Sequence, residues 1–216
     1  TLSMLDLSGA GLVNISDYAF HGLDKNLRSL VLADNRLVTI PTKQLARLSR
    51  LEELSIGQNP YTHLPRGAFK GLTNLRTLTI AGASELRYIE SGVFSDNLNL
   101  ESLTLTSNKY LSQLADGSLT GLPNLKDLVL RDNGFVSLKE SLAAWPELRK
   151  LDLSENPLEC DCSLVWLRDL LTQRNTTHVL CSDPSSLKDK SLKLLTNEDL
   201  GCSTYVSNHQ TLIGAI

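Results

Sequence analysis

The sequence is poor in aromatic residues, methionine and net charge. Aromatic residues make up 5% of its 216 residues, methionine occurs once, and the formal net charge at pH 7 is −3. This balance gives no reason to expect a nucleic acid as partner, because nucleic-acid-binding domains carry strong basic patches. No apolar run reaches the roughly 18 residues that suggest a membrane-spanning helix, so none is expected within the chain.

The sequence also lacks the arrangements of residues that carry catalysis or bind metals. It contains no glycine-rich phosphate loop, no His-x-x-x-His pair and no nucleophile elbow. Its four histidines fall outside the strands predicted below: His21, His63, His178 and His209. We therefore expect a protein that is not an enzyme and that has no catalytic residue, no metal site and no cofactor.

Leucine, in contrast, accounts for 46 residues and recurs with a fixed step. Within one block, Leu30 and Leu32 turn inward and leave the residue between them outward, as a strand with one buried face requires. Stacked blocks of this kind predict a solenoid with seven parallel strands and one continuous core. Near-identical blocks begin at six leucines that lie 23 to 25 residues apart: Leu27, Leu51, Leu75, Leu100, Leu125 and Leu148.

Asparagine recurs where each strand turns inward. A buried amide is unfavourable unless it is hydrogen-bonded, so these side chains are expected to bond the backbone of the turns as a continuous ladder. Alanine replaces asparagine at Ala10 and Ala83, and the second replacement lies in a lengthened block, which predicts a local irregularity near Gly82 to Leu86. The asparagine position is occupied in five blocks: Asn35, Asn59, Asn108, Asn133 and Asn156.

The consensus of the blocks, L-x-x-L-x-L-x-x-N-x-L, resembles that of the leucine-rich repeat family from Leu2 to Asn156. The resemblance implies an α/β solenoid, a leucine-rich repeat horseshoe with a parallel concave sheet. Residues 1–156 would form about seven repeats. Because Leu2 already occupies the first position of a repeat, we expect the repeat region to be incomplete at its N-terminus.

All four cysteines follow the last repeat. Two lie in the segment Asn156-Pro157-Leu158-Glu159-Cys160-Asp161-Cys162, and the others are Cys181 and Cys202. Four cysteines allow three pairings into disulfides. Zinc is the alternative, but Cys-x-Cys with distant partners differs from the paired Cys-x2-Cys spacing of zinc knuckles.

The cysteine pattern is similar to the C-terminal flanking domain of secreted and cell-surface leucine-rich repeat proteins, such as Slit, Toll-like and neuronal adhesion receptors. The resemblance implies that Cys160 pairs with Cys181 and Cys162 with Cys202, in a cysteine-rich cap over residues 157–202. Disulfides persist in an oxidising environment, so we expect an extracellular protein, secreted or at the cell surface. Two sequons agree with this compartment and are predicted glycosylation sites: Asn14 and Asn175.

The cap and the tail beyond it carry further apolar patterns. Helical spacing of apolar residues between positions 163 and 174 predicts a helix that covers the last repeat, with Trp166 in the core. Trp145 replaces a leucine of the return segment and is also predicted to be core. Residues 203–216 form either a frayed tail or a juxtamembrane segment, with a membrane anchor that continues beyond Ile216.

The predicted strands display a grid of outward side chains, and binding is the use that remains for such a surface. The grid is small and polar, whereas anchors at protein interfaces are commonly aromatic or arginine. Either a partner approaches the smooth middle strands and meets charged residues at one edge, or it uses the lateral returns, the cap or repeats outside this chain. The first interpretation predicts a ligand-binding set of nine residues: Glu53, Thr79, Thr104, Thr106, Asp127, Arg131, Asp132, Lys150 and Asp152.

These observations favour a non-enzymatic extracellular binding scaffold, the ectodomain of a cell-surface receptor or adhesion protein that recognises an extracellular protein ligand or receptor. Two alternatives use the same scaffold: an innate immune recognition receptor for microbial products and a secreted extracellular-matrix protein. The repeats alone do not separate the three, because function resides in surface sites rather than in the fold.

Overall fold

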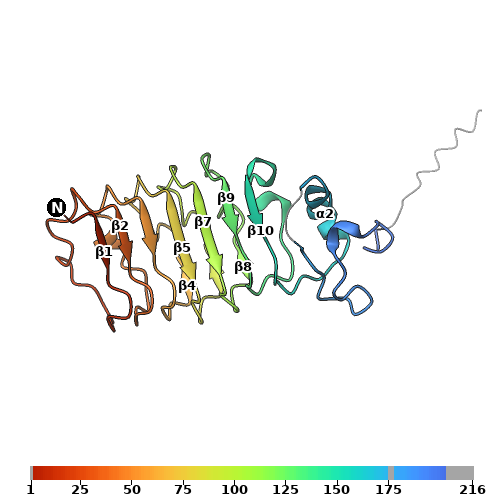
Figure 1. The fold of residues 1–216 in the computed structure, drawn as a ribbon, viewed down its shortest axis with the longest axis horizontal. Helices are drawn as coiled ribbons and strands as arrows, with labels where there is room; N and C mark the ends of the chain where they lie inside the picture. The colour runs from red at the N-terminus through yellow and green to blue at the C-terminus, as the bar shows by residue number, and fades with distance from the viewer. Residues whose placement is uncertain (1, 175–177, 203–216) are drawn as a thin grey trace, which may run out of the picture.

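The computed structural model describes residues 2–174 and 178–202. Its main feature is a seven-stranded parallel sheet that runs along the long axis of the molecule, in the order β1-β2-β3-β5-β7-β9-β10 (Figure 1). Each strand comes from one repeat and pairs with the next, which confirms the predicted parallel solenoid. The strands are β1 (Met4–Asp6), β2 (Ser29–Val31), β3 (Glu53–Ser55), β5 (Thr77–Ala81), β7 (Ser102–Thr106), β9 (Asp127–Val129) and β10 (Lys150–Asp152).

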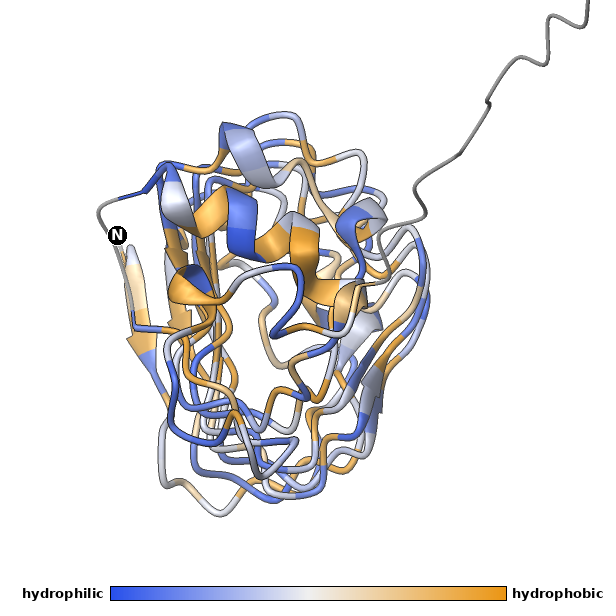
Figure 2. Ribbon diagram, turned by 90° about the vertical axis from the view of Figure 1, so that its right-hand side faces the viewer, coloured by the Kyte–Doolittle hydropathy of each residue, from blue (hydrophilic) through white to orange (hydrophobic). Residues whose placement is uncertain are grey.

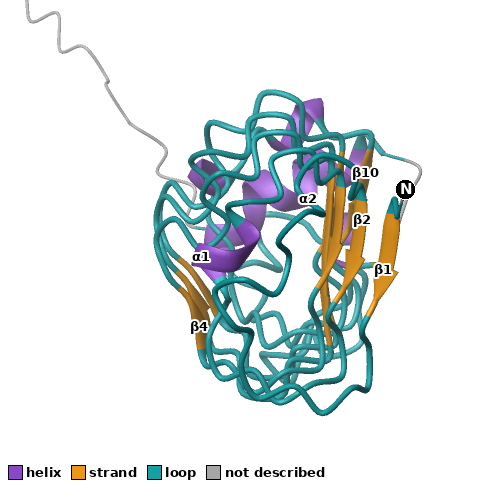
Figure 3. Cartoon of the chain, turned by 90° about the vertical axis from the view of Figure 1, so that its left-hand side faces the viewer, coloured by secondary structure: helices purple, strands orange, loops and turns teal. Residues whose placement is uncertain are grey.

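A second, smaller parallel sheet lies across the core from the first, as the view along the solenoid shows (Figure 3). It consists of β4 (His63–Leu64), β6 (Tyr88–Ile89) and β8 (Gln113–Leu114), in that order. The returns of the repeats also contain the short helix α1 (Thr42–Leu45) and the 3-10 helices η1 (Glu140–Leu142) and η2 (Trp145–Glu147). Most of each return is therefore turn, and the helical share of the repeats is small.

The leucines that face inward form one continuous core between the two sheets. Leu30, Leu54, Leu78, Leu103 and Leu128 stand in register across neighbouring strands, and each is at most 2% exposed. Burial of one leucine contributes about 1.5 to 3 kcal/mol to folding. No repeat buries its own apolar face alone, so stability arises from the stacking.

The recurrent asparagines form the predicted ladder. In one rung, the amide nitrogen of Asn59 donates to the carbonyls of Leu32 (3.0 Å) and Gly57 (2.9 Å), and its oxygen accepts from the N–H of Leu37 (3.0 Å). Asn59 is 2% exposed, so these bonds satisfy a buried amide. The ladder prediction is confirmed.

The block with Ala83 loses one amide of the ladder but keeps its backbone bonds. The N–H of Ala83 donates to the side-chain oxygen of Asn108 at 2.8 Å, and the N–H of Gly82 donates to the carbonyl of Thr106 at 2.9 Å. Strand β5 pairs with β7 over five residues at this place. The expected irregularity is therefore limited to the missing asparagine.

The cap closes the end of the core with η3 (Cys162–Leu164), α2 (Val165–Thr172) and η4 (Leu192–Leu194). Leu164, Leu167 and Leu171 are at most 1% exposed and pack into the hydrophobic core. Figure 2 looks onto this end, where α2 lies across the front of the repeats. The predicted helix over the last repeat is confirmed, and within the described residues no helix has the length and apolarity to cross a bilayer.

The two tryptophans meet at the junction between the repeats and the cap. Trp145 is 1% exposed, and its indole N–H donates to the carbonyl of Glu140 at 2.8 Å. The ring centroids of Trp145 and Trp166 lie 5.2 Å apart. Trp145 is core as predicted, while Trp166 is partly buried and packs against the core from the cap side.

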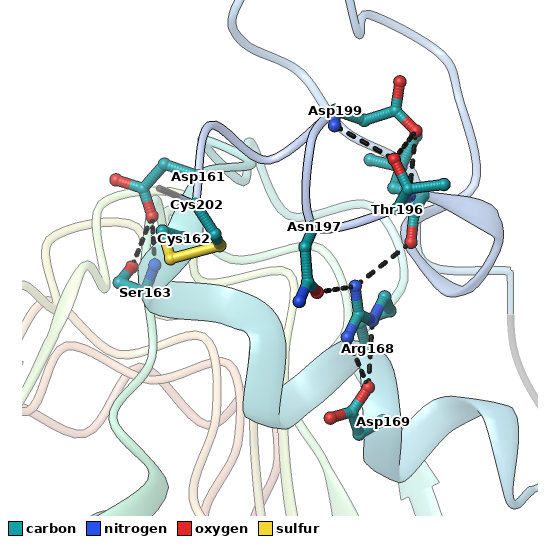
Figure 4. Close-up of a disulfide and its surroundings, with 10 residues drawn as sticks. Asp161, Cys162, Ser163, Arg168, Asp169, Thr196, Asn197, Asp199 and Cys202 are labelled. Atoms are coloured by element: carbon teal, nitrogen blue, oxygen red, sulfur yellow. Dashed lines mark hydrogen bonds and ion pairs between the residues drawn. A yellow bond between two sulfur atoms is a disulfide. The ribbon is translucent and has the colours of Figure 1, made fainter. Parts of the chain in front are cut away.

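Both disulfides are those that the family resemblance implies, Cys160 with Cys181 and Cys162 with Cys202. Around the second one, the carboxylate of Asp161 accepts from the N–H of Ser163 at 2.8 Å and so caps η3 (Figure 4). The Arg168 guanidinium of α2 donates to the side-chain oxygen of Asn197 at 2.6 Å. The Cys162–Cys202 bond ties the last segment of the cap to η3, and the Arg168 contact ties it to α2.

Removal of the first disulfide, by the double change Cys160→Ala and Cys181→Ala, is expected to lower the free energy of unfolding by about 3 kcal/mol. The bond closes a loop with a sequence separation of 21, which restricts the unfolded chain. Chemical denaturation of the oxidised parent and the variant, both without reductant, measures the difference. Equal midpoints and slopes would show that this link does not stabilise the cap.

Candidate ligand-binding face

The sheet face, which we define as the outward side chains of the seven main strands and of the turns that follow them, presents aligned columns of residues. The register places Glu53 beside Thr77, Thr79 beside Thr104, and Asp127 beside Lys150. The nine predicted site residues therefore all lie on one surface. Glu53 on β3 is separated by β5 and β7 from the charged residues of β9 and β10.

One column of the sheet face has left-handed backbone in every repeat. A left-handed backbone costs a residue other than glycine about 1 to 2 kcal/mol, and aspartate tolerates it better than most residues. The predicted site residue Asp132 belongs to this column, so its position is set by the turn after β9. The φ angles lie between +49° and +68° at Gly9, Asp34, Gln58, Gly82, Ser107, Asp132 and Glu155.

Two ion pairs occupy much of the charged end of the sheet face at β9 and β10. The guanidinium of Arg149 donates to both carboxylate oxygens of Asp127, at 2.8 and 3.1 Å, and this contact raises the pKa of Arg149. Arg131 pairs with Glu155. Lys150 forms no ion pair within residues 2–174 and 178–202. Asp127 and Arg131 are thus neutralised locally, whereas Lys150 remains an open charge.

The polar members of the predicted set differ in what they offer to a partner. The Asp152 carboxylate accepts from the N–H (3.0 Å) and the hydroxyl (2.6 Å) of Ser154 within its own turn. The hydroxyl oxygen of Thr106 is buried and has no partner in the part of the chain that the structure describes. Thr79 and Thr104 are partly exposed at the centre of the sheet. The open hydroxyls therefore lie on β5 and β7.

A charged ladder that was not expected from the sequence runs along the edge where the main strands begin. Salt bridges join Arg28 to Glu52 and Arg76 to Glu101, one repeat apart in each case. Exposed pairs of this kind contribute about 0 to 1 kcal/mol each. The signal is present in the sequence, because the residue before each strand recurs with the repeat period: Arg28, Glu52, Arg76, Glu101, Lys126 and Arg149.

Aromatic side chains gather on the returns instead of the sheet face. His63 on β4 and Tyr88 on β6 stack with ring centroids 5.1 Å apart, and the Arg87 guanidinium lies 5.2 Å from the ring of Tyr110. Within the described residues, no cluster of histidine, cysteine, aspartate and glutamate has the geometry to hold a metal ion.

The predicted glycosylation sites fall on different parts of the chain. Asn14 and the following Ser16 are exposed on the return after β1. Asn175 lies outside the described residues, as does the predicted juxtamembrane tail at residues 203–216.

Family models match both parts of the chain. The model described as leucine rich repeat matches residues 1–60, 25–84 and 98–158, and the model described as leucine rich repeat C-terminal domain matches residues 178–203. The human 5T4 structure (Wnt-activated inhibitory factor 1, Trophoblast glycoprotein) is similar with 20% identity and a TM-score of 0.43, over 92% of this chain and 94% of that one.

Curated relatives are much longer than this chain. Leucine-rich repeat-containing G-protein coupled receptor 5 of Rattus norvegicus is 39% identical over 72 residues, which is 32% of this chain and 8% of the relative. Leucine-rich repeat and fibronectin type III domain-containing protein 1-like protein of Danio rerio is 30% identical over 189 residues, 88% of this chain and 22% of the relative. Repeats, cap and matched models agree, and the chain belongs to the leucine-rich repeat family.

Proposed function

We propose that this chain is a non-enzymatic binding scaffold of an extracellular receptor or adhesion protein, and that it holds a protein ligand on the sheet face. The observation that carries the proposal is the exposed end of the sheet at β9 and β10. There Lys150 lies beside Asp127 in the strand register, and Arg131 and Asp132 follow strand β9 on the same surface. Mixed charges of this kind favour specific orientation of a protein partner.

Two further observations support the extracellular setting of this proposal. The cap holds two disulfides, and disulfides persist in oxidising compartments. One similar protein is named as a G-protein coupled receptor with leucine-rich repeats. A receptor or adhesion role for this chain agrees with both.

The test is a screen of the labelled chain against a panel of extracellular domains displayed on cells, followed by variants of the sheet face. Arg131→Ala and Asp127→Ala are expected to weaken binding of a captured ligand about tenfold each, as for residues at the centre of an interface. The midpoint of thermal unfolding should change little, because surface ion pairs contribute about 0 to 1 kcal/mol each.

Lys70→Ala is the matched control, because this exposed lysine lies on a return and forms no ion pair within residues 2–174 and 178–202. It should leave ligand affinity unchanged. If both sheet-face variants bind as the parent does, the ligand uses another surface and the proposed face is wrong.

We also propose that Asn14 carries an N-linked glycan when the chain is secreted. The side chain is exposed, and the sequon Asn14-Ile15-Ser16 is read by its residue pattern. Asn14→Gln, expressed in secreting eukaryotic cells, should run at a lower mass than the parent by one glycan, and removal of glycans with an amidase should abolish this difference. An identical mass before treatment would contradict the assignment.

A further inference from the structure

An open groove lies between the last repeat and the cap, with a volume of about 610 Å³. One wall is the segment of η1 and η2, which includes Glu140 and Pro146, and the other is the exposed side of α2. We call this site the junction groove. It lies outside the sheet face, and no part of the proposed function uses it.

The walls of the junction groove are held in place by the fold. Trp145 and Trp166 contact each other across the junction, with ring centroids 5.2 Å apart. At the end of α2, the guanidinium of Arg174 donates to the carbonyls of Trp145 (2.7 Å) and Pro146 (3.3 Å). The groove is therefore formed before any ligand arrives, which lowers the entropy cost of binding.

Most residues that line the junction groove are apolar, and its two charged lining residues are acidic, while the guanidinium groups of Arg168 and Arg174 lie at its edge. Val165, Trp166 and Leu170 line the groove from α2, and two carboxylates, those of Glu140 and Asp169, belong to the lining, which contains no lysine or arginine. Glu140 has no ion-pair partner in the part of the chain described by the structure. Asp169 accepts from Arg168 through one oxygen only, and its side chain is 56% exposed.

Two other grooves of the described residues lack this combination. The groove beside β8, of about 390 Å³, includes both Asp116 and Lys139, which form a salt bridge at 3.0 Å. The groove of about 480 Å³ on the returns includes both Lys126 and Glu147. Of these three grooves, the junction groove alone has acidic lining residues and no basic lining residue, and Glu140 is its carboxylate without an ion-pair partner within the described residues.

We propose that the junction groove receives a lysine or arginine side chain from an extended segment of an extracellular partner protein. The aliphatic stem of that side chain packs on Trp166 and Leu170, and its cationic head lies between Glu140 and Asp169. An aromatic face attracts a cation, and the aliphatic stem of lysine or arginine covers apolar surface while its charged head stays in water. The proposal rests on the proposed function only for the source of the segment, because the site itself is testable with a peptide.

Tryptophan fluorescence reports directly on this groove, because the chain contains two tryptophans and both line it. The probes are the blocked tripeptides acetyl-Leu-Lys-Leu-amide and acetyl-Leu-Arg-Leu-amide, with acetyl-Leu-Gln-Leu-amide as the neutral control. Titration into the intact chain should change tryptophan emission in a saturable way for the cationic peptides. The neutral peptide should bind about tenfold more weakly, and added salt should weaken the cationic peptides.

The variant for this test is the double change Glu140→Gln and Asp169→Asn, which keeps the shape of the groove. It should weaken the cationic peptides about tenfold, while Asp116→Asn, in the groove beside β8, should leave them unchanged. Thermal unfolding of each variant checks that the fold is intact. Equal affinity for all three peptides, no saturable change, or an unaffected double variant would overturn the proposal.

These outcomes separate the junction groove from the sheet face. If the cationic peptides bind but Arg131→Ala and Asp127→Ala have no effect on a captured ligand, the sheet-face proposal fails and the groove stands. If the peptides fail while the sheet-face variants weaken the ligand, the groove proposal fails and the scaffold function stands.

Discussion

Replacement of Asn133 by leucine is expected to lower the free energy of unfolding by about 4 kcal/mol, because buried backbone groups that lose their partners cost about 1 to 3 kcal/mol each. The side-chain nitrogen of Asn133 donates to the carbonyls of Leu105 and Leu130, both at 2.8 Å, and its oxygen accepts from the N–H of Asn108 at 3.0 Å. Leucine has a similar size but offers no polar atom. Chemical denaturation followed by circular dichroism measures the change.

Asn74→Leu is the control for this prediction. Asn74 also bonds a carbonyl of the neighbouring repeat, Ser49, but the contact is exposed, so water replaces it. Its loss should change stability by less than about 0.5 kcal/mol. An Asn133→Leu variant as stable as the parent would mean that the ladder contributes nothing to the stacking.

Gly57→Ala is expected to lower the free energy of unfolding by about 3 kcal/mol, the upper end of the usual cost of overpacking, because the added methyl group has no space and forces the backbone to move. A methyl group at Gly57 would lie 2.1 Å from the carbonyl oxygen and 2.6 Å from the nitrogen of Ala81, and both atoms belong to strand β5. Backbone cannot move aside as a flexible side chain would. The expected result is a lower midpoint of thermal unfolding and weaker pairing between β3 and β5 by hydrogen exchange.

Ala33 is the control for this prediction, because it occupies the position in the preceding repeat that Gly57 occupies in its own. Ala33→Gly removes a methyl group instead of adding one, and its expected cost is below about 1 kcal/mol. If Gly57→Ala proves as mild as this control, the close approach of the two strands is absent in solution.

Local pattern was sufficient to predict the seven main strands, the leucine core and the asparagine ladder, but it did not predict the short strands β4, β6 and β8 of the returns. The inward leucines recur with the repeat period, and the parallel pairing of Leu54 with Leu78 follows from stacking equivalent blocks. The disulfides followed from resemblance, because the spacing of Cys160, Cys162, Cys181 and Cys202 alone left three pairings open.

The candidate site was predicted only in part. Repeat register placed the outward columns correctly, since one face of a strand follows from a period of two. The sequence did not show which charged side chains remain without an ion pair. Arg149 pairs with Asp127 of the preceding repeat, and Arg131 pairs with Glu155 of the following one. A long arginine side chain can reach the repeat before it or the repeat after it, and the repeat period does not specify which of the two it pairs with.

By itself, the sequence determined that this protein is a stack of leucine-rich coils sealed by a crosslinked cap, because periodic burial and covalent bonds depend on residue type and order. Only the tertiary structure decided which charged residues pair between repeats, the lack of space for a side chain at Gly57, and the groove between Trp166 and Glu140. These features arise from distances between segments that are remote in sequence, and no local pattern specifies such distances.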